Sequence, residues 1–146
     1  MMSLDVYIIA NRPEHAEWQT KRKNSLAEAG EMKGLIPIIE QYYADREPDK
    51  TEELYWANIT HNLAGMADAA SIYQHLWRPE ELGITKAGDL IDPLTIGFEK
   101  LKANPDHYKT FNPKNGWGDY NGFIDWVERY LQACKENPGG TIQVSR

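Results

Sequence analysis

Three clusters of polar and aromatic residues contain the side chains of this sequence that could bind a ligand or perform chemistry. The first cluster, residues 56–62, includes Asn58, His61 and Asn62. We expect a helix to begin within it, and the free backbone N–H groups at a helix N-terminus attract anions and carbonyl oxygens. Histidine adds a side chain whose charge can change near neutral pH. The alternative interpretation is that Asn58 or Thr60 caps the helix and His61 makes only a local hydrogen bond.

The second cluster, residues 76–82, centres on Arg78, which we expect at the C-terminal end of the same helix, where a cation is favoured. Its planar guanidinium could bind a carboxylate or a phosphate group. A structural ion pair with Glu80 or Glu81 would explain the same residues. Arg78 is therefore a candidate for a second site, or one half of a structural pair.

The third cluster, residues 111–120, is rich in residues that form tight turns. Asn115 and Gly116, with Gly118 two residues later, indicate unusual backbone angles on either side of Trp117. Trp117 lies outside the helical spacing of the other tryptophans. It either lines a cleft or plugs the end of a helical bundle.

The first and third clusters meet if the central and last helices pack side by side. The ligand-binding residues of the resulting polar, aromatic-lined pocket would be Asn58, His61, Asn62, Asn115 and Trp117. Arg78 would lie at the other end of its helix, about 25 Å away at the normal rise per residue. We therefore expect it outside this pocket.

Motifs for the common catalytic and cofactor sites are absent from the sequence. It has no phosphate-binding loop, dinucleotide fingerprint, nucleophile elbow or zinc-protease motif. Cys134 is the only cysteine, and the histidines are scattered. We expect no metal and no cofactor, and the catalytic residues, if the protein is an enzyme, are unknown.

The hydrophobic pattern predicts an α+β fold with a small antiparallel sheet of about three short strands packed against a helical bundle. The expected strands are residues 4–9, 53–57 and 141–145, where β-branched and aromatic residues alternate with polar ones. A sheet this small needs helices on one face to be stable.

The expected helices are set by apolar spacing and by their capping residues. Residues 13–29 begin with Pro13 and end before Gly30, and residues 35–44 form a second helix. A central helix is expected over residues 58–77. Another begins near Thr85 and either kinks or restarts at Pro93. Asp119 should cap the last helix, in which Cys134 is a core residue.

Length and composition predict a single α+β domain over residues 1–146. The hydrophobic fraction is 41% and the charged fraction 26%, which are values of a globular chain. The net charge of −6 argues against nucleic-acid binding. The sequence contains neither a membrane span nor a secretion signal, so we expect a cytoplasmic protein that does not bind membranes.

Several motifs resemble those of a family of small uncharacterised proteins encoded in bacterial and phage or prophage genomes. They are residues 3–7 (SLDVY), 56–63 (WANITHNL), 76–82 (LWRPEEL), 111–118 (FNPKNGWG), 130–136 (YLQACKE) and 144–146 (VSR). The resemblance covers the first ten residues and nearly everything after Thr51, and it implies no activity. Family members are shorter, so residues 11–50 are expected to be an insertion between the first two strands. Ala64-Gly65 stands where the family has Gly-Lys, which removes a basic residue close to His61.

Three functional hypotheses follow from these residues. The first is a binding module for a small ligand or a peptide. The second is a phage-related interaction factor that docks on another protein through its acidic surface or the inserted segment. The third is an enzyme with His61 as the general base.

Overall fold

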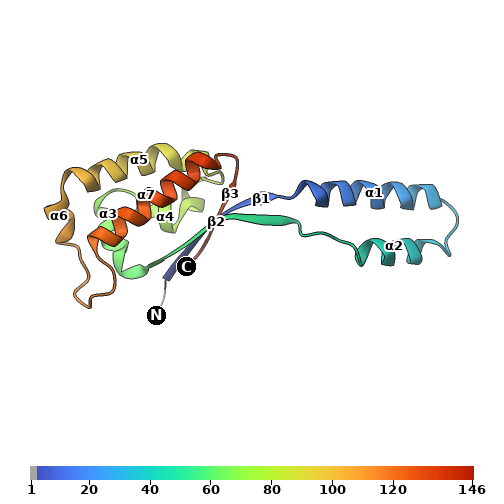
Figure 1. The fold of residues 1–146 in the computed structure, drawn as a ribbon, viewed down its shortest axis with the longest axis horizontal. Coiled ribbons are helices and arrows are strands. Elements are labelled where there is room, and N and C mark those ends of the chain that lie inside the picture. The colour runs from blue at the N-terminus through green and yellow to red at the C-terminus, as the bar shows by residue number, and fades with distance from the viewer. Residues whose placement is uncertain (1–2) are drawn as a thin grey trace. The chain divides into compact units, whose positions relative to one another are not determined.

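The computed structural model describes residues 3–146 and divides the chain into two compact units. The larger unit combines the described part of Met1–Ile9 with Glu53–Arg146, and the smaller unit is Ala10–Glu52. Residues 11–50, which the sequence sets apart, lie within the smaller unit. Figure 1 traces the elements of each unit along the chain.

The sheet consists of β1 (Ser3–Asn11), β2 (Thr51–Thr60) and β3 (Thr141–Ser145) in the order β2-β1-β3. β1 and β3 are antiparallel, with Asp5 opposite Ser145 and Ile9 opposite Thr141. Every second residue of β1 from Leu4 to Ile8 is buried, which places one face of the sheet on the core. The predicted α+β class with a small antiparallel sheet is confirmed. β3 has its predicted limits, and β1 and β2 extend beyond theirs.

The helices of the larger unit cover that face of the sheet. After β2 come the short 3-10 helix η1 (His61–Leu63), α3 (Ala64–Ala69), α4 (Tyr73–Trp77), the 3-10 helix η2 (Pro79–Leu82), α5 (Gly88–Ala103), α6 (Pro105–Lys109) and α7 (Tyr120–Glu136). α5 and α7 pack closely against each other. Asp119 Oδ1 accepts a hydrogen bond of 2.7 Å from Gly122 N, so the predicted cap of the last helix is confirmed.

The prediction of one central helix over residues 58–77 is wrong. β2 continues to Thr60, and the helical part is divided between α3 and α4. The break lies at Ser71, whose φ of 65° is left-handed. The sequence offers apolar residues on two faces of the supposed helix, and one straight helix could not bury both against a single core. The break allows Ile72, which is 1% exposed, to pack against α5 at Gly97, where there is no side chain.

α5 begins later than predicted because the preceding residues pair with β3. Ile142 N donates to Thr85 O at 2.8 Å, and Ala87 N donates to Gly140 O at 2.9 Å. Pro93 lies inside α5, and the helix continues through it without a restart. Thr85 therefore belongs to a short strand-like segment and does not cap the helix.

The smaller unit contains a hairpin of two helices, α1 (Pro13–Ala29) and α2 (Ile36–Ala44). Trp18 Nε1 donates to Tyr43 O at 2.8 Å and holds the two helices together. α1 has its predicted limits, with Pro13 in its first turn and Gly30 at φ 50° after its last. His15 and Ala29 are the only residues of this unit that are fully buried. The hairpin therefore has almost no core of its own.

Among residues 3–146, no helix combines the length and the apolar character required to cross a membrane.

Candidate functional site

The end of β2 and the turn before α7 lie against each other. Asn62 Nδ2 donates to Asn115 Oδ1 at 3.5 Å. Gly118, at φ 97°, approaches so closely that an added Cβ would lie 2.9 Å from Thr60 Cγ2 and 3.0 Å from Leu63 Cδ1. Only glycine suits this backbone conformation at this distance. The chain thus brings together the segments that carry four of the candidate residues, which we call the amide–indole cluster: His61, Asn62, Asn115 and Trp117.

The imidazole of His61 is held by the indole of Trp77. Trp77 Nε1 donates to His61 Nδ1 at 2.7 Å, and Tyr73 stacks on the buried Trp77 at 5.5 Å between ring centroids. An indole N–H can only donate, so Nδ1 must carry the lone pair. The hydrogen of the neutral ring is therefore on Nε2, and His61 presents an N–H donor. The helical spacing of Trp77 gives no signal for this bond.

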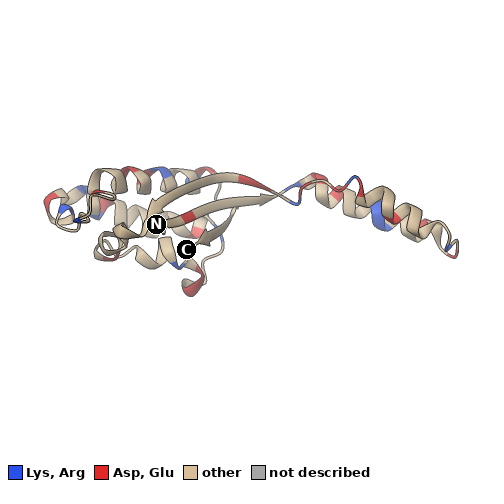
Figure 2. Ribbon diagram, turned by 90° about the horizontal axis from the view of Figure 1, so that it is seen from below, with Lys and Arg blue, Asp and Glu red and all other residues tan. Residues whose placement is uncertain are grey.

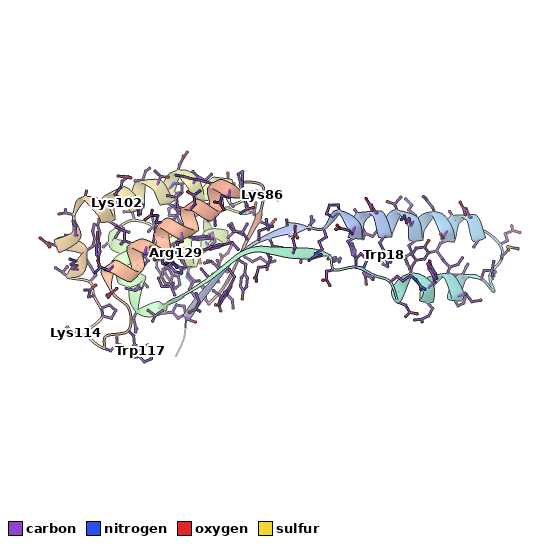
Figure 3. The ribbon with its side chains drawn as sticks, viewed as in Figure 1. Trp18, Lys86, Lys102, Lys114, Trp117 and Arg129 are labelled. Carbon is purple, nitrogen blue, oxygen red and sulfur yellow. The ribbon has the colours of Figure 1, made fainter. Side chains whose placement is uncertain are left out.

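The turn that carries Trp117 is built by asparagine side chains. Asn115 Oδ1 accepts from Trp117 N at 3.0 Å, and Asn112 Oδ1 accepts from Tyr120 N at 2.7 Å. Figure 3 shows Trp117 in the loop between α6 and α7. Its side chain is 58% exposed, so it does not plug the end of the bundle. The indole is an open aromatic surface on the turn that also carries Asn115.

Asn58 lies on β2, away from any helix N-terminus. Its Nδ2 donates to Ser3 Oγ and to Asp5 Oδ1, both at 2.8 Å, and Trp56 Nε1 reaches the same carboxylate at 3.3 Å. Asn58 therefore links β2 to β1 on the face of the sheet opposite the core. The helix cap is Thr60, whose Oγ1 accepts from Asn62 N at 3.3 Å. Of the five candidate ligand-binding residues, Asn58 is the one that the hydrogen bonds assign to the sheet.

The expected separation of about 25 Å between Arg78 and the first cluster is wrong, because it assumed a continuous helix. The break at Ser71 turns the chain back, and Trp77, the residue next to Arg78, hydrogen-bonds to His61. Arg78 Nη1 lies 3.2 Å from Glu81 Oε2, which is the structural pair given above as the alternative. Hydrogen bonds to Tyr73 and Glu81 raise the pKa of Arg78.

Arg146 is a connecting residue that the sequence analysis missed. Its Nη1 donates to Trp77 O at 2.7 Å and to Glu80 Oε1 at 2.5 Å. It ties the end of β3 to the segment that supports His61. No local pattern indicates such a contact, because its partners are distant in the sequence.

Burial shifts the pKa values of several titratable groups. Burial raises the pKa of the Cys134 thiol to about 12, and it raises the pKa of Tyr130 as well. Burial lowers the pKa of His75. The cysteine is thus a protonated core residue and cannot serve as a nucleophile near neutral pH. In the described part of the chain, no group of three or more His, Cys, Asp or Glu residues could hold a metal ion.

The amide–indole cluster offers an aromatic face, two amides and an imidazole N–H. Such a set can stack against a planar group and form hydrogen bonds with its polar edge. It contains no arrangement of nucleophile and base. In comparisons with protein-family models, curated protein sequences and solved structures, no match to the chain was found.

Proposed function

We propose that the protein is a binding module that takes a small ligand or a peptide at the amide–indole cluster. The observation that carries this proposal is the hydrogen bond from Trp77 to His61, which holds the imidazole and leaves the hydrogen of the neutral ring on Nε2. A preorganised donor of this kind loses little freedom when a ligand binds.

The chemistry of the cluster favours a planar ligand with both a donor and an acceptor. Asn62 Oδ1 and Asn115 Nδ2 take part in no hydrogen bond within residues 3–146. They provide an acceptor and a donor in the cluster that also contains the exposed indole of Trp117. A peptide bond next to an aromatic side chain, or a heterocycle with an amide-like edge, matches this arrangement.

A thermal-shift screen with nucleosides, monosaccharides, free amino acids and dipeptides tests the proposal. The variant is Trp117→Ala, and the matched control is Trp56→Ala, since the two indoles are 58% and 53% exposed. At a concentration about 100-fold above Kd, a ligand stabilises the folded state by about 2.7 kcal/mol. We expect this shift in the wild type and in Trp56→Ala, and its loss in Trp117→Ala. A screen without a hit, or equal loss in both variants, contradicts the proposal.

A second candidate function is that of a phage-related interaction factor acting through the smaller unit. Exposed apolar side chains on and next to α2 favour it: Met32, Leu35, Ile38 and Tyr42. Ile38 is 65% exposed, and side chains of this type become buried in protein interfaces. Replacing residues 11–50 by a short linker should then abolish capture of a partner in a pull-down. Retention of that partner by the shortened protein would count against this function.

The third candidate, an enzyme with His61 as general base, has less support. A base needs a lone pair directed at the substrate, whereas the ring nitrogen of His61 that is free of Trp77 carries the hydrogen. We also infer a cytoplasmic protein without a nucleic-acid partner. The net charge is −6, and Figure 2 shows Lys and Arg residues interspersed with Asp and Glu in each unit.

A further inference from the structure

At the β3 edge of the sheet, backbone N–H and C=O groups point away from β1, and some of them have no hydrogen-bond partner within residues 3–146. Ile142 N donates to Thr85 O, away from β1, so Ile142 and Ile8 form a pair without mutual hydrogen bonds. Such pairs alternate along an antiparallel ladder, and Val144, opposite Val6, is the next one. The N–H and C=O of Val144 therefore point outward, and no bond to them occurs within residues 3–146.

The chain itself already covers the first half of this edge. Lys86 forms an antiparallel bridge with Thr141, flanked by the bonds of Ile142 N to Thr85 O and of Ala87 N to Gly140 O. The chain then departs from the edge, because Ile84 N donates to Pro79 O at 3.1 Å in the turn after η2. The edge is thus occupied as far as Ile142 and open at Val144.

A groove of about 400 Å³ lies beside the open part of this edge. Its apolar lining comes from β3 and from the segment around η2, and an ion pair adds polar lining. The lining includes Pro79, Ile84, Ile142 and Val144, with Glu80 and Arg146 as the ion pair. The hydrogen bonds of Arg146 to Trp77 O and Glu80 connect the end of β3 to the segment around η2.

We propose that this groove binds an extended segment of another protein as an additional strand next to β3. The outward N–H and C=O of Val144 are satisfied by another strand, and the apolar lining takes the alternate side chains of that strand. An extended segment needs only the width of one strand, and the groove is lined by β3 and by residues around η2. A second copy of the folded chain would bring its own η2 and Thr85 segment to the same edge. The groove is separate from the amide–indole cluster, so the two proposals stand independently.

The probe is a pool of capped octapeptides in which apolar β-branched residues alternate with Ser, Thr, Lys or Glu. A matched pool has proline at two central positions and cannot form the backbone bonds. We expect the alternating pool to bind and the proline pool to bind at least tenfold more weakly, measured by fluorescence anisotropy. In the wild-type protein, hydrogen exchange of the Val144 amide should slow when the tightest peptide is added.

Val144→Pro tests the edge directly, because it removes an N–H that takes no part in the pairing with β1. Ser145→Ala is the control, since it alters a side chain of the same strand that does not line the groove and leaves every backbone group intact. We expect at least tenfold weaker peptide binding for Val144→Pro and a change within twofold for Ser145→Ala. If Val144→Pro fails to fold, the exchange of the Val144 amide in the wild type still decides the question.

Three outcomes would overturn the proposal. In the first, the alternating pool binds no better than the proline pool. In the second, peptide binds without slowing exchange at Val144. In the third, the Val144 amide becomes protected as protein concentration rises without peptide, which would identify a second copy as the occupant. The variant Trp117→Ala should leave peptide binding at this groove unchanged, which separates the result from the proposed function.

Discussion

The indole of Trp77 and the imidazole of His61 share a hydrogen bond of 2.7 Å that fixes the tautomer of the histidine. Trp77→Phe removes the donor and leaves Nδ1 of a half-buried ring without a partner. We expect it to cost about 1–3 kcal/mol beyond the loss of packing. Urea unfolding measures the cost, and long-range proton–nitrogen NMR spectra should show the Nε2–H tautomer in the wild type and a mixture in the variant.

Trp126 supplies the matched control for this substitution. Its Nε1 is buried without a hydrogen-bond partner within residues 3–146, so Trp126→Phe removes an indole without breaking a hydrogen bond. Trp77→Phe should therefore be the more destabilising of the two. Equal effects, with an unchanged tautomer of His61, would show that the bond does not orient the imidazole.

The thiol of Cys134 gives a prediction for reactivity and for pH. Its pKa is raised from an ordinary value of 9.0 to about 12 because it is buried. A thiol reagent should not modify the native protein near neutral pH, and it should modify the unfolded chain. An added exposed thiol on the same helix, Gln132→Cys, should react in the native state. Rapid reaction of native Cys134 would contradict its placement in the core.

The sign of the pH effect follows from the direction of the same shift. A folded-state pKa above the unfolded value favours the folded state fully below pH 9.0, and this contribution is lost between pH 9.0 and about 12. Cys134→Ala should remove this part of the alkaline loss of stability. The free energy of unfolding, measured by urea titration at a series of alkaline pH values, checks the prediction.

At the scale of elements, the approach of the turn before α7 to the end of β2 depends on Gly118. Gly118→Ala combines a positive φ with a Cβ only 2.9 Å from Thr60, whereas Gly116→Ala has a positive φ of 78° and no neighbour within 4 Å. We expect the strained backbone to lower the free energy of unfolding by about 1–3 kcal/mol in each variant. Gly118→Ala should lower it more, because Thr60 and Leu63 must also move. Equal losses in urea unfolding would mean that the close approach contributes nothing.

In the elements that were predicted well, the apolar spacing and the residues that begin and end the element are both visible in the local sequence. α7 has an apolar stripe and the cap Asp119, and α1 has Pro13 and Gly30 at its two ends. The break between α3 and α4 has no such signal. Ser71 is neither glycine nor proline, and its left-handed conformation follows from the burial of Ile72 against α5. Local spacing therefore favoured one helix where packing produces two.

The candidate site was predictable only in part, because local sequence signals mark some of its residues and packing between distant segments decides the rest. Asn62, Asn115 and Trp117 stand out as polar or aromatic residues at the ends of elements, and the chain brings their segments together. The role of Trp77 was not predictable, because its partner His61 is reached through the break at Ser71. Asn58 was expected at the start of a helix and lies on a strand, because β2 continues past the expected start of the helix.

At the scale of the whole molecule, the division into two units predicts that the larger one folds without the smaller. β1 and β2 are neighbours in the sheet, so Ile9 and Glu53 can be joined by a short turn such as Asn-Gly in place of residues 10–52. The buried residues of β1, β2 and the helices from α3 to α7 all remain in this shortened chain. We expect cooperative thermal unfolding with a midpoint within a few degrees of the full-length protein.

The isolated segment 10–52 is the complementary test. His15 and Ala29 are its only buried residues, and chains of about 40 residues seldom bury enough apolar surface to fold alone. By circular dichroism we expect partial helicity and no cooperative transition. If the segment unfolds cooperatively while the shortened chain does not fold, the core of the protein depends on residues 10–52, and the division into units would not describe how it folds.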